Sequence, residues 1–154
     1  NSIKGSKAVN LHDYLWVHLD NTFRAFIYEK DRSPQITGFL NAAQQQIAQN
    51  TLELTGLNRE PSSPETVKDK RWKARKAAWD AALQAKVNLG QQPSEQMSQI
   101  ILVLAIHTGF WSIWMTVFQN DTDMRQRLID AFQGTSTDCF DGQTQALPRP
   151  NGQL

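Results

Sequence analysis

The chain has 154 residues, 40% of them hydrophobic, and its 16 Lys and Arg nearly balance its 15 Asp and Glu. This length and composition suit one folded domain and argue against global disorder or a chain that is cationic throughout. The single cysteine excludes an internal disulfide and zinc modules built from several cysteines. No signal peptide is visible after Asn1, although one removed earlier would leave no trace, and the working expectation is a cytoplasmic protein.

The first helix is predicted to begin at Asn10, a residue favoured at the N-cap, with Asp13 in the first turn. Apolar residues then recur at steps of three and four, which is typical of an amphipathic helix. They are Leu11, Tyr14, Leu15, Leu19, Phe23, Phe26 and Ile27. The pattern stops in the charged residues 29–32, and Pro34 forbids its continuation.

A second helix is predicted to start with Ser33 as N-cap and Pro34 as the first helical residue, and to stop at Gly56. The connection between these two helices is short, so they are predicted to be antiparallel neighbours.

The third helix is predicted to start in the same way at Ser63 and Pro64 and to run to about Leu89, with Gly90 ending it. One side carries the bulky residues Trp72, Trp79, Leu83 and Val87, and the opposite side carries Ala74, Ala77, Ala78, Ala81 and Ala85. Such a helix either packs on both sides or exposes its alanine side.

A fourth helix is predicted from Pro93, Ser94 and Glu95 to about residue 119, and a short fifth helix from Asn120 or Asp121 to a stop at Gly134. Beyond it, Asp141-Gly142 is a weak hairpin candidate. The sequence therefore predicts an all-α protein, an antiparallel up-and-down bundle of four to five helices in residues 1–134. Residues 135–154 are predicted to be an extended or weakly ordered tail, whose last ten residues are a weak candidate for docking onto a partner.

Residues 100–118 form the most unusual stretch, 19 residues without a formal charge. Its length just reaches what a bilayer requires, but Lys and Arg are missing from its immediate flanks and Trp111 and Trp114 lie inside it. We therefore favour a buried central helix over a membrane span, with a helix shared across an oligomer interface as a third hypothesis. Its small and polar residues share one arc of the predicted helix and are the helix-interface candidates: Ala105, Thr108, Gly109, Ser112 and Thr116.

A basic run is the main nucleic-acid signal, with six Lys and Arg against one Asp between residues 68 and 76. Helical geometry divides these charges among several faces, so we favour solvated charges and salt bridges at the rim of the bundle. An acidic protein partner and nucleic acid remain alternatives. The candidate binding residues are Lys68, Lys70, Arg71, Arg75 and Lys86.

The search for catalytic or metal-binding groups finds no convergent set. His12 and His18 are six positions apart and cannot chelate one ion together on a helix. His107 is predicted to be a hydrogen-bonded core residue, Cys139 an incidental thiol, and Asp121 a helix cap. We therefore predict no enzyme activity, no cofactor and no metal.

The function predicted from the sequence is a non-catalytic protein–protein interaction module, such as an adaptor, chaperone, inhibitor or structural subunit. Its partner would be another protein or a second copy of the chain, because aromatic and apolar residues are abundant and supply anchors at interfaces. The alternatives are a nucleic-acid-binding helical protein that uses residues 68–76 and a small membrane subunit with one span at residues 100–118.

Overall fold

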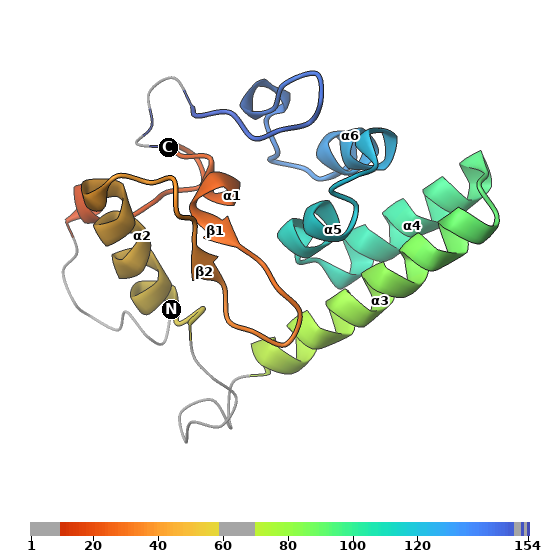
Figure 1. The fold of residues 1–154 in the computed structure, drawn as a ribbon, viewed down its shortest axis with the longest axis horizontal. Coiled ribbons are helices and arrows are strands. Elements are labelled where there is room, and N and C mark those ends of the chain that lie inside the picture. The colour runs from red at the N-terminus through yellow and green to blue at the C-terminus, as the bar shows by residue number, and fades with distance from the viewer. Residues whose placement is uncertain (1–9, 59–69, 150–151, 153) are drawn as a thin grey trace. The chain divides into compact units, whose positions relative to one another are not determined.

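The computed structural model describes residues 10–58, 70–149, 152 and 154, and the chain forms two compact units (Figure 1). The first unit comprises residues 1–63 and 146–154, and the second comprises residues 64–145. Six α-helices and one two-stranded sheet lie in the described residues, so the mainly helical character predicted from the sequence is confirmed. Residues 135–154, predicted as one tail, are shared between the two units.

The first unit combines short elements with one longer helix. In chain order they are the 3-10 helix η1 (Leu11–Asp13), α1 (Thr22–Ala25), β1 (Phe26–Ile27), β2 (Gln35–Ile36) and α2 (Ala42–Thr55). The two strands pair antiparallel, with Phe26 opposite Ile36.

The long helix predicted from Asn10 to Ile27 is wrong, although its apolar spacing is helical. Side chains take the backbone donors that such a helix would use. The Leu15 N–H donates to Thr51 Oγ1 over 2.8 Å, and the Trp16 N–H donates to Asp20 Oδ2 over 2.8 Å. Asp20 is a local acceptor of the kind that competes with helix formation, and Thr51 is a distant acceptor with the same effect on the Leu15 N–H.

The predicted start of the second helix is also wrong, because Gln35 and Ile36 form a strand and α2 begins only at Ala42. The start is set by a capping box. The Gln44 N–H donates to Asn41 Oδ1 over 2.9 Å, and the Asn41 N–H donates to Gln44 Oε1 over 3.1 Å. The predicted stop at Gly56 is confirmed, with a left-handed φ of 65°.

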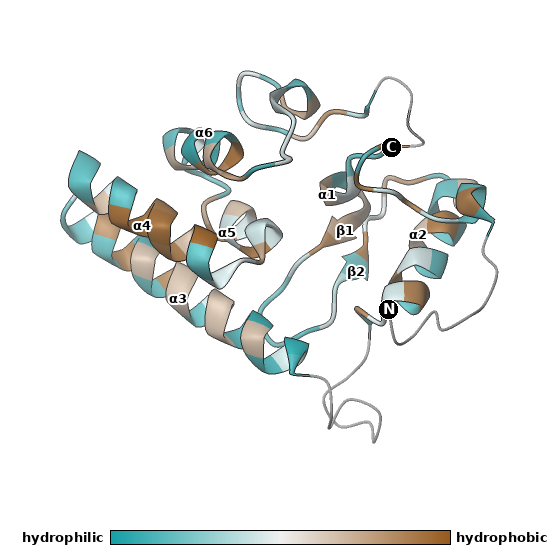
Figure 2. Ribbon diagram, turned by 180° about the vertical axis from the view of Figure 1, so that it is seen from behind, coloured by the Kyte–Doolittle hydropathy of each residue, from teal (hydrophilic) through white to brown (hydrophobic). Residues whose placement is uncertain are grey.

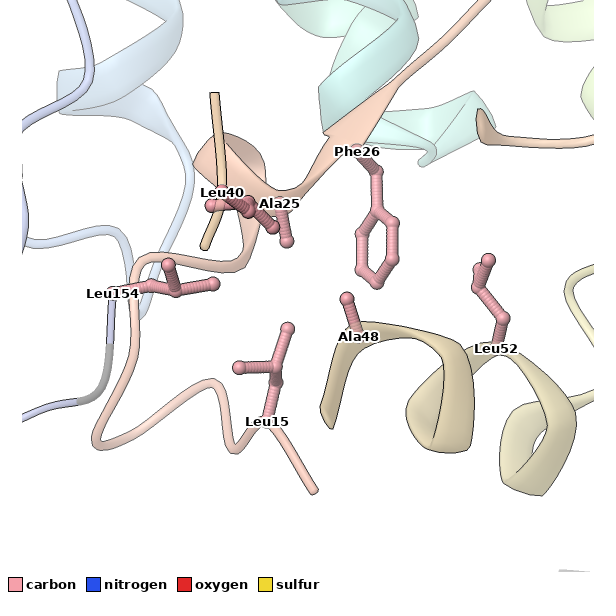
Figure 3. Close-up of a cluster of buried hydrophobic side chains, with 7 residues drawn as sticks. All are labelled: Leu15, Ala25, Phe26, Leu40, Ala48, Leu52 and Leu154. Carbon is pink, nitrogen blue, oxygen red and sulfur yellow. The ribbon is translucent and has the colours of Figure 1, made fainter. Parts of the chain in front are cut away.

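A small apolar cluster holds the first unit together (Figure 3). Its members come from the chain just after η1, from α1, β1 and α2, from the connection before α2, and from the last described residue. They are Leu15, Ala25, Phe26, Leu40, Ala48, Leu52 and Leu154.

The second unit is built from four α-helices and a 3-10 helix. These are α3 (Arg71–Gln91), α4 (Glu95–Thr108), α5 (Trp111–Val117), α6 (Thr122–Ala131) and η2 (Thr137–Cys139). A tight connection after α3 turns the chain so that α4 runs back alongside it (Figure 1). Helix α5 packs on α3, and α6 packs on α4 and α5. The large side chains Trp114, Phe118, Met115 and Leu128 are fully buried in this unit.

Several helix ends in the second unit match the prediction. Ser94 caps α4 by accepting from the Met97 N–H over 3.1 Å, and Asp121 caps α6 by accepting from the Met124 N–H over 2.9 Å. The predicted start of α3 at Ser63 lies outside the described residues. Its predicted end at about Leu89 is two residues early, because Gly90 lies inside the helix, which ends at Gln91.

The single helix predicted over residues 100–118 is wrong, because the chain breaks at Gly109 and Phe110. Gly109 has φ 71° and Phe110 has φ 56°, both in the left-handed region that ends a right-handed helix. The Trp114 Nε1–H donates to Thr108 Oγ1 over 3.2 Å and so links the two sides of the break. Among the described residues, every helix is too short or too polar to cross a bilayer.

Candidate interaction surface

The outer face of α4 is exposed and apolar. Val103 is 68% exposed, and Ile100 and Ile106 are each 53% exposed. Leu104 on α4, and Leu83 and Val87 on the neighbouring α3, are also exposed. We call these six residues the α3–α4 apolar surface: Leu83, Val87, Ile100, Val103, Leu104 and Ile106.

Helix α4 exposes apolar residues because residues 100–106 are all apolar, so that the middle of the helix, brown in Figure 2, is apolar on all sides while its ends are polar. Its inward face buries Ser98, Ile101, Leu102 and Ala105. A helix apolar all round normally lies buried on all sides. The described part of the second unit buries only one side of α4, which leaves the α3–α4 apolar surface facing outward.

The helix-interface candidates occupy places that differ from the predicted arc. Ala105 is fully buried and Gly109 forms the break, while Ser112 and Thr116 lie on α5. The five residues therefore do not form one stripe on one helix. The small residues of α3 and α4 pack inward instead, because Ala78, Ala82 and Ala85 are buried on α3.

The basic candidates do not form one cationic site in the described residues. Lys70 and Arg71 are exposed at the start of α3, while Arg75 lies over the Trp72 ring at 5.2 Å from its centroid. The Lys86 Nζ donates to the Val117 carbonyl over 2.8 Å and so caps the end of α5. Lys68 lies outside the described residues. As binding residues, all five stay predictions.

A charged group ties α4 to α6. The Arg127 guanidinium donates to Glu95 Oε1 and to Asp123 Oδ2, each over 2.7 Å. The hydrogen bond from Arg127 lowers the pKa of the exposed Glu95, with a smaller contribution from Gln99. The two carboxylates raise the pKa of Arg127. This group is exposed, so it orders the helix ends more than it stabilises the fold.

Arg125 is a buried cation that periodicity did not reveal. It lies on α6 and donates to the Thr144 carbonyl, while its buried Nε has no hydrogen-bond partner in the described residues. Burial lowers the pKa of the Arg125 guanidinium, and the Asp141 carboxylate opposes this shift. Thr144 is also buried and has a left-handed φ of 60°, unusual for a β-branched residue.

The turn at residues 141–145 makes this arrangement possible. Asp141 Oδ1 accepts from the Gln143 and Gln145 N–H groups over 2.9 and 2.8 Å. The sequence marked Asp141-Gly142 only as a weak turn signal, and an arginine on an amphipathic helix carries no sign that it will be buried. Arg125 therefore anchors a folded turn where a weakly ordered tail was predicted.

The candidate chemical groups are dispersed. The prediction that His107 lies in the core is wrong, because the side chain is exposed on α4. His12 and His18 are exposed as well, and Cys139 is buried in η2. The described residues contain no group of three or more His, Cys, Asp or Glu able to hold a metal ion.

The geometry therefore offers an apolar contact surface and no assembled set of acid, base and nucleophile in the described residues. Comparison of the chain with protein-family models, with curated proteins and with solved structures found no match.

Proposed function

We propose that the protein is a non-catalytic protein–protein interaction module that self-associates through the α3–α4 apolar surface. The observation that carries this proposal is the exposure of four aliphatic residues on one helix, α4. Contiguous exposed apolar surface is uncommon on monomers and marks interaction sites. The short connections between α3, α4, α5 and α6 support the up-and-down bundle order proposed for these helices. A cytoplasmic location stays a prediction.

The size of the surface suits a reversible dimer. Six side chains of this size, between 36% and 68% exposed, present roughly 500 Å² of apolar area, which is within the range of functional patches. Two such patches that face each other bury about 1,000 Å², close to the lower limit for a specific interface.

The charge distribution favours a second copy over a charged partner. Between Gln96 and His107, α4 carries no Lys, Arg, Asp or Glu. A surface without formal charge can meet its own copy across a two-fold axis without placing like charges opposite each other. Salt concentration should therefore have little effect on the dimer.

The test is sedimentation velocity on the full chain and on a Val103→Asp, Ile106→Asp double variant. Both residues are exposed, so the variant should keep its helical circular dichroism while its dimer dissociation constant rises at least tenfold, because two carboxylates would lose hydration. The matched control is Gln99→Asp, an exposed polar position on the same helix. A wild-type chain that stays monomeric at high micromolar concentration, or a double variant that dimerises like the wild type, would refute the proposal.

Nucleic-acid binding is the second candidate, favoured by the exposure of Lys70, Arg71 and Lys73 at the start of α3. If this function is correct, the protein should be retained on a phosphate matrix, and its retention should fall steeply as the salt concentration rises. The variant with Lys70, Arg71 and Arg75 changed to Ser should then lose this retention. Unchanged retention of the triple variant would exclude this function.

A further inference from the structure

The first unit holds the described residues of the segment 147–154, which are residues 147–149, 152 and 154, in the manner of a bound peptide. The anchor is Leu154, which is 2% exposed and whose side chain enters the apolar cluster of the first unit (Figure 3). The other members of that cluster, among them Leu15, Leu40 and Leu52, come from parts of the chain more than 100 residues earlier. The apolar cluster of the first unit therefore buries one leucine side chain of this segment.

Asn21 holds the backbone of the segment at two points. Its side-chain Nδ2 donates to the Leu147 carbonyl over 2.8 Å, and its backbone N–H donates to the Leu154 carbonyl over 3.0 Å. Asn21 itself is buried, at 6% exposure. The hydrogen bonds of a buried polar group are costly to lose. Asn21 therefore favours a segment that places two backbone carbonyls where those of Leu147 and Leu154 lie.

Arg149 adds a third attachment. Its guanidinium donates to the His18 carbonyl over 2.8 Å, and its backbone N–H donates to the Leu154 carbonyl over 3.0 Å. The second of these bonds lies within the segment and brings Arg149 and Leu154 together, as in a turn.

Position 152 requires glycine because the neighbouring atoms leave no room for a Cβ. A Cβ at this position would overlap the Leu19 carbonyl oxygen and would lie 2.9 Å from Asp20 Oδ1. The φ of Gly152 lies outside the left-handed region, so backbone conformation alone would allow other residues. We call the Leu19 carbonyl and the Asp20 side chain the Leu19 and Asp20 wall. This wall leaves room only for glycine two positions before the anchoring leucine.

We propose that the first unit is a binding site for a peptide that has the pattern Leu-x-Arg-x-x-Gly-x-Leu and turns between its arginine and its last leucine, and that Leu147, Arg149, Gly152 and Leu154 occupy it as an intramolecular ligand. Pro148 and Pro150 flank Arg149 in the sequence and reduce the conformational freedom that the segment loses on docking. A tethered ligand has an effective concentration on the order of 1 mM, so a partner peptide must displace the segment to bind. This site is independent of the α3–α4 apolar surface.

The experiment measures binding of a fluorescent peptide with the sequence of residues 146–154 to three full-length chains by anisotropy. In wild type the tethered segment competes, so the peptide binds weakly. In Gly152→Ala the tethered segment is displaced by its own Cβ, so the apparent affinity for the peptide rises at least tenfold. The matched control is Gly142→Ala, since a Cβ on Gly142 meets no atom within 4 Å; this chain should behave as wild type.

A variant peptide and a second variant chain test the same proposal in two further ways. A peptide that carries Ala in place of the glycine should bind none of the chains, because the Leu19 and Asp20 wall rejects it. If Gly152→Ala does not fold, Leu154→Ala replaces it, because that chain lacks only the anchoring side chain. Equal peptide binding by wild type and the displaced chain, or failure of every displaced chain to bind the peptide, would overturn the proposal.

Discussion

The two units of this protein are stabilised in different ways. In the second unit the helices satisfy most of their own backbone hydrogen bonds, and large side chains such as Trp114 and Phe118 fill the core. In the first unit the apolar cluster is smaller, and side chains complete the hydrogen bonding of an irregular backbone. Thr51, Asp20 and Asn21 each bind a backbone group there.

This difference teaches where sequence patterns are informative. Hydrophobic periodicity reports helices whose stability comes from packing, and it says little about segments held by single polar side chains. Substitutions should therefore affect the two units through different mechanisms, and four predictions test this comparison.

The largest effect should come from Trp114→Ala in the second unit. Trp114 is fully buried, stacks on Phe118 and donates to Thr108. Its loss leaves a large cavity, so the free energy of unfolding should fall by about 3–5 kcal/mol. Denaturant titration measures this change, and hydrogen exchange should show the loss of protection in α3 and α5. Leu83→Ala, at an exposed position, should cost far less.

Thr51→Val should give the largest hydrogen-bond effect in the first unit. The substitution keeps the volume but removes the oxygen that accepts from the buried Leu15 N–H. The unpaired donor should lower the free energy of unfolding by about 1–3 kcal/mol. Thr55→Val on the same helix is the control, because its hydroxyl donates to the helix carbonyls of Thr51 and Leu52. Equal stability of the two variants would contradict the importance of this polar contact.

Helix caps should contribute similarly in both units, since capping is local. Asn41→Ala on α2 and Ser94→Ala on α4 should each lower the free energy of unfolding by about 1 kcal/mol. Both residues accept from a backbone N–H in the first turn. A clearly larger loss at Asn41 in chemical denaturation would show that the first unit depends on its cap more than this comparison allows.

The smallest effect should be the pH dependence contributed by Glu95. Arg127 lowers the Glu95 pKa below its ordinary value of 4.5. Its contribution to stability is therefore complete above that value and is lost as the pH falls through the lowered pKa. The difference in melting temperature between wild type and Glu95→Gln should shrink on acidification.

Much of the second unit could be predicted from the sequence. The positions of α4 and α6 could be predicted from the caps Ser94 and Asp121 and from the helical spacing of apolar residues, because caps and periodicity act locally. The break at Gly109 and Phe110 could not be predicted, since glycine inside an apolar run is common and the left-handed Phe110 depends on tertiary packing.

The first unit was predicted less well. Residues 10–27 have helical spacing, yet Thr51 lies 36 positions after the Leu15 N–H that it binds, so no local pattern announces the contact. The candidate surface was missed for a related reason. The prediction treated residues 100–118 as one buried helix, whereas α3 and α4 pack together with Ala82, Ala85 and Ala105 buried and with Val103 and Ile106 exposed to solvent.

The burial of Cys139 has a practical consequence. It is the only thiol in the chain and is 5% exposed within η2, next to the turn that Arg125 anchors. An alkylating reagent can reach it only when this part of the second unit opens. The rate of thiol modification therefore reports the opening of the η2 region in the natural sequence, without an introduced label.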